Sequence, residues 1–253
     1  FYEEILEGIH SIILATDSEL LVCPETRAPR RILLERLVDG AIVFDSKIAD
    51  EAVLSLAAGG FPIVVLDRLL EAETILPLLL DNASGVRAAF AHLHEQGCRR
   101  MSFIAGAPDS FDNAERLGAF VAEAEQHQLT VSVVQGNFTE ASGYEAGKTI
   151  LKSGVLPDAV FCANDQMAIG LLRALKEANM QAPGDMAVVG FDDIPLARYT
   201  QPSLSTVGAS RFEWGAGAVE QLIAFLDCGT PFTPARISTH FCARQSSSWS
   251  TRN

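Results

Sequence analysis

The chain has little positive charge and no long apolar run, and both absences narrow the kinds of protein it can be. It holds 19 Lys and Arg against 32 Asp and Glu in 253 residues, a formal net charge of −13. Because so acidic a surface repels phosphate groups, this chain by itself is not expected to bind DNA or an anionic membrane. No run of about 18 apolar residues predicts a membrane-spanning helix. The opening Phe1-Tyr2-Glu3-Glu4 does not resemble a signal peptide.

Cysteine is scarce, and its spacing forms no pattern. The five cysteines are odd in number, widely spaced and without a CxxC pair: Cys23, Cys98, Cys162, Cys228 and Cys242. This usage argues against a disulfide framework and against a zinc site. We therefore predict no metal site and no cofactor, and a reducing cytoplasm as the compartment.

Signatures of catalysis are also missing. The sequence contains no GxGxxG motif, no P-loop and no GxSxG nucleophile elbow. His92 and His94 stand two apart in a helical pattern, so they point to different faces and cannot share a metal ion. An enzyme would have to depend on carboxylates alone, and we predict that the chain is not an enzyme.

What the sequence does contain is an alternation of short apolar runs with helical patterns. Most runs are rich in β-branched residues and do not alternate with polar ones, which is typical of strands buried on both faces. Helical spacing follows, as at Val86, Ala89, Phe90 and Leu93. The repeated βαβ order predicts an α/β fold with parallel sheets. The predicted strands lie at Leu20–Val22, Ala41–Phe44, Ile63–Leu66, Met101–Ile104, Val131–Val134, Ala159–Cys162 and Ala187–Val189.

Polar residues and glycines follow nearly every predicted strand, at the sheet edge where ligands of parallel sheets bind. Their carboxylates, amides, guanidinium and aromatic ring suit a polar, hydroxyl-rich ligand. Each has a plainer explanation, however: an Asp or Asn after a strand is often a helix N-cap, and Phe138 could be a core residue. Arg116 could be a solvated helix residue. The positions are Asp45, Asp67-Arg68, Gly106, Gly136-Asn137-Phe138, Asn164-Asp165 and Asp192-Asp193.

A longer pattern near the C-terminal end is more specific. The stretch from Val188 to Val207, with Gly190-Phe191-Asp192-Asp193 and Pro202-Ser203-Leu204-Ser205-Thr206-Val207, resembles a motif of the LacI/GalR (lactose-repressor) family of transcriptional regulators. Further matches run in order from Phe1 to about Ala243 and include Asp81-Asn82, Gly136-Asn137-Phe138-Thr139 and Ala163-Asn164-Asp165-Gln166.

The resemblance implies two similar parallel-sheet lobes with a ligand cleft between them, a periplasmic-binding-protein-like fold. One lobe would hold residues 1–97 and 211–235, and the other 98–207 and 238–250. The first strand of the family's fold and its DNA-binding helix-turn-helix have no counterpart in the chain. The segment between Cys23 and Val38 is also shorter than in the family.

The resemblance also implies roles for single residues. Asp192 would accept hydrogen bonds from the effector, Arg116 would be the cleft arginine, Asn164 a polar contact and Phe138 a stacking ring. Four further effector contacts would be Phe1, Tyr2, Arg68 and Asp112. Leu196 and Tyr199 would be buried in a homodimer interface.

Three functions compete at this stage. The leading prediction is the effector-sensing core of a homodimeric LacI-type regulator, which binds a sugar or related polar metabolite, a purine being less favoured, and reaches operator DNA through an N-terminal domain. The alternative is an extracytoplasmic sugar-binding protein of a transporter. The third, a sugar- or nucleotide-processing enzyme, is disfavoured because no catalytic constellation supports it.

Overall fold

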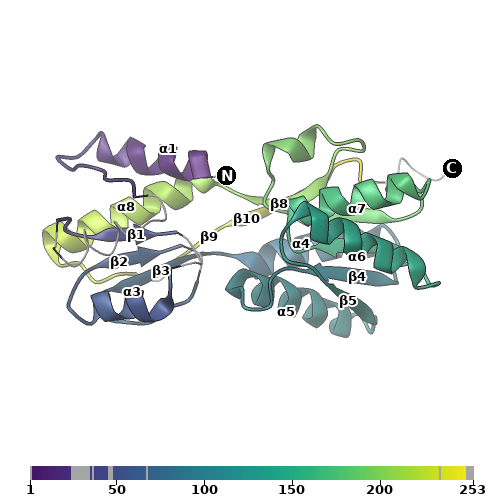
Figure 1. Cartoon of the computed structure of the whole chain (residues 1–253), viewed down its shortest axis with the longest axis horizontal. Helices are drawn as coiled ribbons and strands as arrows, with labels where there is room; N and C mark the ends of the chain where they lie inside the picture. The colour runs from purple at the N-terminus through teal and green to yellow at the C-terminus, as the bar shows by residue number, and fades with distance from the viewer. Residues whose placement is uncertain are drawn as a thin grey trace. The chain divides into compact units, whose positions relative to one another are not determined.

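The computed structural model describes residues 2–23, 35, 37–44, 48–66, 68–233 and 235–248. The chain divides into two compact units (Figure 1). Unit 1 comprises Phe1–Leu80 and Ser210–Ile237, and unit 2 comprises Asp81–Ala209 and Ser238–Asn253. Each unit is built from a β-sheet with helices packed on it.

Unit 1 has a four-stranded parallel sheet in the order β1-β2-β3-β9. The helix α1 lies along α8 (Figure 1), and the two come close because Gly8 and Gly215 face the other helix's backbone. A Cβ atom at either glycine would overlap a carbonyl oxygen of the opposite helix. The elements are α1 (Tyr2–Ile13), β1 (Ala41–Val43), α3 (Asp50–Ala57), β2 (Ile63–Val65), β3 (Ile75–Leu80), α8 (Arg211–Cys228) and β9 (Ala235–Ile237).

Unit 2 has a six-stranded sheet in the order β10-β8-β7-β6-β4-β5. Its strands are parallel except β10, which pairs antiparallel with β8. The helix α4 packs against α5, and α6 packs against α7. The elements are α4 (Asn82–Glu95), β4 (Met101–Ala105), α5 (Phe111–Gln126), β5 (Val131–Gln135), α6 (Glu140–Lys152), β6 (Ala159–Cys162), α7 (Asp165–Glu177), β7 (Ala187–Phe191), η1 (Pro195–Arg198), β8 (Ser205–Ala209) and β10 (Thr239–Cys242).

The predicted α/β fold with parallel sheets is confirmed, and the helical pattern of α4 is confirmed in detail. Val86, Ala89, Phe90 and Leu93 are all fully buried. The predicted strand at Leu20–Val22 is wrong: these residues form no strand, and each of them is 41–58% exposed. Apolar composition alone could not show that this run lacks a neighbouring strand with which to pair.

The position of the first boundary between the units also differs from the prediction. Unit 1 ends at Leu80, whereas the first lobe was predicted to extend to residue 97. The cause is the packing of α4, whose residue Phe90 stands edge-on to Phe120 of α5 with ring centroids 5.3 Å apart. Gly85 of the same helix lies so close to Val207 that a Cβ atom would overlap its side chain. The helix α4 therefore belongs to unit 2. The second segment of unit 1 spans 210–237, close to the predicted 211–235.

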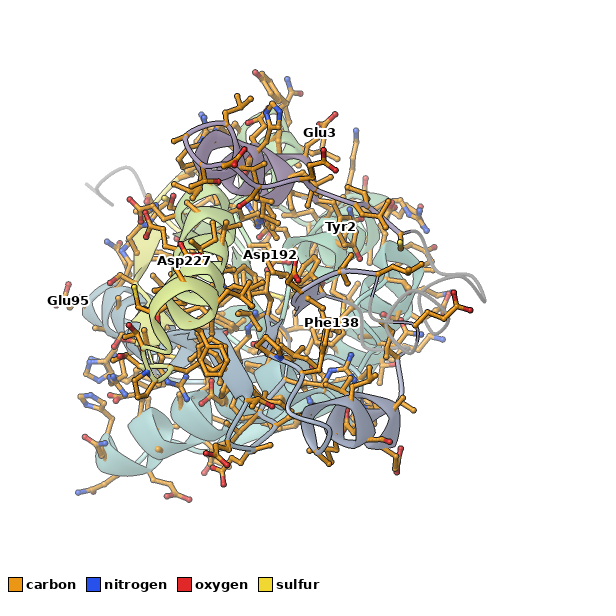
Figure 2. All side chains as sticks on the ribbon, turned by 90° about the vertical axis from the view of Figure 1, so that its left-hand side faces the viewer. Tyr2, Glu3, Glu95, Phe138, Asp192 and Asp227 are labelled. Atoms are coloured by element: carbon orange, nitrogen blue, oxygen red, sulfur yellow. The ribbon has the colours of Figure 1, made fainter. Side chains whose placement is uncertain are left out.

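Acidic side chains such as Glu3 and Glu95 project from the ribbon into solvent (Figure 2). Among the described helices, none combines the length and the apolar character that crossing a membrane requires.

Candidate functional site

The most constrained charged side chain of the predicted site is Arg116, in the middle of α5. Only 3% of the residue is exposed. Its Nε donates to Asn82 Oδ1 at 2.8 Å, its Nη1 donates to the carbonyl oxygen of Ala163 at 2.8 Å, and its guanidinium lies 3.7 Å from the centroid of the Phe191 ring. Hydrogen bonds and ring stacking together fix the plane of the guanidinium. The alternative that Arg116 is a solvated helix residue is therefore wrong.

Two carboxylates approach this guanidinium without forming a short ion pair. Asp112 Oδ2 lies 3.5 Å from Nη2, and Asp192 Oδ1 lies 3.8 Å from Nη1. Both carboxylates keep some contact with solvent, since 24% of the Asp112 side chain and 17% of the Asp192 side chain are exposed. The structure thus brings together three predicted residues, with one buried donor group beside two partly exposed acceptors.

Asn82 completes this group, and the sequence analysis gave it no role. It is fully buried in the first turn of α4, and its Nδ2 donates to Asp112 at 2.8 Å and to Glu115 at 3.0 Å. Its Oδ1 accepts a hydrogen bond from Arg116, so the Asn82 amide fixes the positions of Arg116 and Asp112 relative to each other. The only available signal was the pair Asp81-Asn82 after a strand, and the helix cap there is Asp81, which accepts from the Ser84 N–H.

Phe138 follows β5 and is half-buried. Its φ of 68° lies in the left-handed region, which non-glycine residues rarely adopt without support. The support comes from Asn164, whose Nδ2 donates to the Phe138 carbonyl oxygen at 2.9 Å. The ring contacts Gly106 so closely that a Cβ atom there would overlap it. The conformation of Phe138 is therefore held from two sides.

Asn164 is the N-cap of α7, as the plainer explanation proposed. Its Oδ1 accepts from the Met167 N–H at 3.0 Å while its Nδ2 holds Phe138. Both ends of the amide are thus engaged within unit 2, and a direct contact with an effector stays a prediction.

Asp192, by contrast, caps no helix. The next helical segment, η1, begins at Pro195, and its N-cap is Ile194. Asp192 and Asp193 have φ values of 114° and 44°, so the chain turns sharply after β7. Asp165 stabilises this turn by accepting from the Ile194 N–H at 2.9 Å and from the Thr206 hydroxyl at 2.5 Å. Burial raises the pKa of Asp165 well above its ordinary value, and the charge of Asp192 raises it further.

The predicted contacts of unit 1 form a separate set. Phe1 lies outside the described residues. The Tyr2 ring is 60% exposed and stands edge-on to Phe44, which in turn stands edge-on to Trp214, with ring centroids 5.1 Å and 5.6 Å apart. Arg68 donates to Asp50 Oδ1 at 2.8 Å and also to the Ile48 carbonyl oxygen. The sequence analysis missed Phe44 as a partner of Tyr2.

Leu196 and Tyr199, predicted for a dimer interface, lie on η1 and at its C-cap. They are 51% and 79% exposed in the single chain, which leaves both available to a partner.

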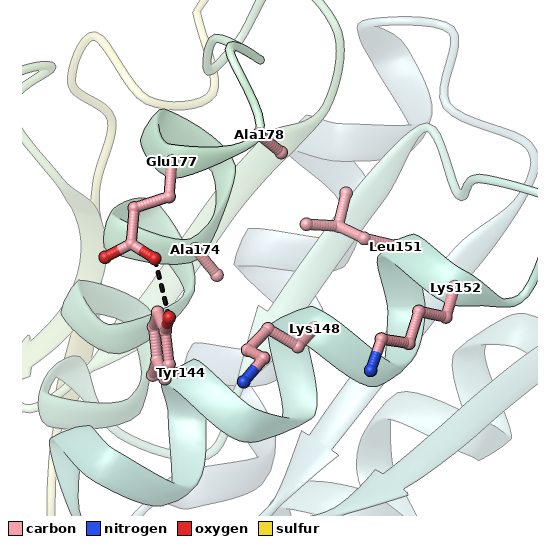
Figure 3. A pocket seen from close by; sticks show the side chains of 7 residues that line it. All are labelled: Tyr144, Lys148, Leu151, Lys152, Ala174, Glu177 and Ala178. Atoms are coloured by element: carbon pink, nitrogen blue, oxygen red, sulfur yellow. Dashed lines mark hydrogen bonds between the residues drawn. The ribbon is translucent and has the colours of Figure 1, made fainter.

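A surface pocket between α6 and α7 contains none of the predicted residues (Figure 3). The Tyr144 hydroxyl donates to Glu177 at 2.6 Å across it, and the Arg173 guanidinium lies 4.0 Å from the Tyr144 ring centroid. These polar groups are paired with one another, so we assign the pocket no role.

Comparison with known proteins identifies the family. Residues 90–247 match the family model of the periplasmic binding protein-like domain. The chain is 31% identical to the transcriptional repressor PurR of Proteus mirabilis over 235 residues, 88% of this chain and 69% of that protein. It is also 31% identical over 226 residues to the transcriptional regulator AscG of Escherichia coli, covering 88% of this chain and 67% of that protein.

Solved structures agree with these relatives. A sugar-binding transcriptional regulator of the LacI family from Enterococcus faecalis is 33% identical, with a TM-score of 0.85 over 97% of this chain and 92% of that one. The regulator CelR in complex with cellobiose is 27% identical, with a TM-score of 0.86 over 97% of this chain and 78% of that one. These proteins are regulators of transcription and not enzymes, and they do not support the transporter alternative. The chain belongs to the LacI family of transcriptional regulators and corresponds to their effector-binding core.

Proposed function

We propose that this core binds a sugar or a closely related polar metabolite at Arg116, Asp192 and Phe138, and that binding changes the regulator's affinity for its operator. The observation that carries the proposal is the pairing of a buried, fixed guanidinium with the partly exposed carboxylate of Asp192, 3.8 Å away. A hydroxyl group both donates and accepts, so neighbouring ligand hydroxyls can donate to Asp192 and accept from Arg116.

The charge of the group favours a neutral ligand over a phosphorylated one. Arg116 faces both Asp112 and Asp192, so two negative charges surround one positive charge. A phosphate would meet net repulsion there, whereas sugar hydroxyls gain charge-assisted hydrogen bonds. Phe138 supplies the apolar face on which the C–H groups of a sugar ring can stack. A purine could also stack on this ring, and it is the second candidate.

The remaining predicted contacts take supporting parts in this proposal. Asn164, together with Asn82, which was not among the predicted contacts, orients Phe138 and Arg116 through the hydrogen bonds described above. Asp112, Tyr2, Phe1 and Arg68 add contacts that depend on the ligand. The proposed site needs no metal, cofactor or catalytic step.

We further propose a cytoplasmic homodimer with Leu196 and Tyr199 at its interface, because both side chains are large, apolar in part and exposed. Operator contacts are proposed for an N-terminal helix-turn-helix domain. They are not proposed for the 253 residues of this chain, because their net charge of −13 opposes DNA binding.

A thermal-shift screen of the purified chain with sugars, polyols, purine bases and nucleosides tests the proposed effector class. A ligand present at about 100 times its Kd stabilises the fold by about 2.7 kcal/mol, which raises the melting temperature by roughly 5–10 °C for a chain of this size. We expect a saturable shift with a sugar or polyol, confirmed by calorimetric titration. A shift with purines alone would replace the sugar by the second candidate, and no saturable shift with any of these compounds would contradict both.

A further inference from the structure

A cluster of three side chains of the kinds that bind metals includes Asp193, the residue that follows Asp192 in the chain. Asp193, His240 and Cys242 each offer one ligand atom, and these atoms all lie within 4.8 Å of one another. The Cys242 Sγ is 3.9 Å from Asp193 Oδ2. The sequence analysis predicted no metal site, because the cysteines are odd in number, widely spaced and without a CxxC pair.

The topology of the sheet brings the three together. His240 and Cys242 stand two apart on β10 and so share one face of the strand. Phe241 between them packs on His92, with ring centroids 4.9 Å apart. On the neighbouring strand β8, the residue opposite His240 is Gly208. A Cβ atom at Gly208 would come 2.9 Å from Asp193 Cβ and 3.4 Å from the His240 ring, so this glycine leaves the space in which the two approach.

Two arginines contact the two oxygens of Asp193, and they hold them unequally. Arg244 donates to Asp193 Oδ1 at 2.6 Å and is itself tied to the Leu204 carbonyl oxygen at 2.9 Å. Arg198 reaches Oδ2 at the longer distance of 3.4 Å, and 64% of its side chain is exposed. An ion at Oδ2 therefore has to displace only the exposed arginine, while Arg244 keeps orienting the carboxylate as second-sphere partners of metal ligands do.

We propose that Asp193 Oδ2, His240 and Cys242 Sγ form a binding site for one Zn²⁺-like transition metal ion. The ligand types are those of zinc, whose tetrahedral bonds of about 2.0–2.3 Å place ligand atoms about 3.3–3.8 Å apart. Side-chain movements of about 1 Å bring the ligand atoms of Asp193, His240 and Cys242, now within 4.8 Å of one another, to that spacing. Three protein ligands leave a fourth position for water. Asp193 directly follows Asp192, so the ion would brace the turn that presents the proposed effector contact.

A metal titration of the untagged, chelator-treated chain tests the site. Co²⁺ is the first probe, because a cobalt–thiolate bond gives a charge-transfer absorption, and Zn²⁺ is then added to displace it. We expect one equivalent of Co²⁺ with the thiolate absorption, and displacement by Zn²⁺. Cys242→Ser should abolish the thiolate absorption, and His240→Ala should weaken binding at least tenfold.

The matched controls are Cys228→Ser and His10→Ala, which change exposed residues of unit 1. Both controls should bind Co²⁺ as the unchanged chain does. Melting curves without metal verify that all four variants fold. The proposal is overturned if the chain takes up no stoichiometric Co²⁺, if Cys242→Ser keeps the thiolate absorption, or if a control loses binding to the same extent.

Discussion

The ring of Phe138 occupies the space that a side chain at Gly106 would fill. A Cβ atom at residue 106 would overlap Cζ and both Cε atoms of the ring. Gly106 follows β4, and its N–H donates to Asn113 Oδ1 at 2.6 Å, so its backbone is held in place. The glycine therefore determines where the ring can lie, although it need not contact any ligand itself.

Gly106→Ala should displace the Phe138 ring and weaken effector binding about tenfold or more, which corresponds to about 1.4 kcal/mol. Because Phe138 is only half-buried, we expect a fall in the melting temperature of only a few degrees. Calorimetric titration beside a melting curve measures both. Gly118→Ala is the matched control: nothing lies within 4 Å of the added methyl group on α5, so affinity should hold. Unchanged affinity in Gly106→Ala would contradict the stacking role of Phe138.

Arg116→Lys should lower both stability and effector affinity although the charge is kept. A lysine ammonium cannot bond Asn82 Oδ1 and the Ala163 carbonyl oxygen at once in the planar arrangement of a guanidinium. Leaving one buried acceptor unpaired costs about 1–3 kcal/mol, measured by denaturant unfolding. The control is Arg173→Lys, which changes a half-exposed arginine. Its free energy of unfolding should fall by less than about 0.5 kcal/mol. Equal stability of the two variants would show that the bonds of Arg116 contribute nothing.

Asp165→Asn should change how stability depends on pH. Burial raises the pKa of Asp165 well above 3.8 in the folded state, so the folded chain holds this proton more tightly than the unfolded chain. The resulting contribution to the free energy of unfolding is complete below pH 3.8 and is lost as the pH rises toward the folded pKa. An amide does not titrate, and it can still accept from Ile194 and bond Thr206.

The free energy of unfolding of Asp165→Asn, relative to the unchanged chain, should therefore increase as the pH rises from about 4 and then level off. Denaturant unfolding at a series of pH values measures this difference. In the control Asp109→Asn, an exposed carboxyl changes. A difference between Asp165→Asn and the unchanged chain that does not vary with pH would show that folding does not change the pKa of Asp165.

Sedimentation tests the proposed dimer. The unchanged chain should sediment as a dimer, and the double change Leu196→Ser with Tyr199→Ser should raise the dimer Kd at least 30-fold, or about 2 kcal/mol, if these residues are central anchors. Val155→Ser is a suitable control because Val155 is 68% exposed and lies in the loop between α6 and β6. A dimer of undiminished affinity in the double variant would exclude η1 from the interface.

The strands of the sheets could be predicted because a strand that is buried on both faces consists of consecutive apolar residues. Strands such as β6 and β7 consist of fully or nearly fully buried residues, and their apolar runs stand out between polar helix starts. The exposed Leu20–Val22 run is equally apolar, and it pairs with no strand among the residues that the structure describes. Residue types alone therefore cannot separate the two cases.

The place of Asp192 directly after a strand could be read from the sequence, whereas its contact with an effector stays a prediction. The site was not predictable where a residue's role depends on contacts between distant segments. Asn82 acquires its role from Asp112 and Arg116, 30 and 34 positions further along the chain. The grouping of Asp193 with His240 depends on β10 running antiparallel beside β8, which no local pattern reveals.

The most direct test of the central claim is effector titration of Asp192→Ala beside Asp109→Ala, using the compound that the thermal screen identifies. Asp192 is the acceptor opposite Arg116, and each charge-assisted hydrogen bond that it makes is worth about 1.5–3 kcal/mol. Asp192→Ala should therefore weaken binding about 100-fold or more while the ligand-free melting temperature stays within a few degrees of the unchanged chain. The exposed Asp109→Ala should bind normally. If Asp192→Ala binds the effector as tightly as Asp109→Ala, the effector does not bind at this carboxylate and the proposed site is wrong.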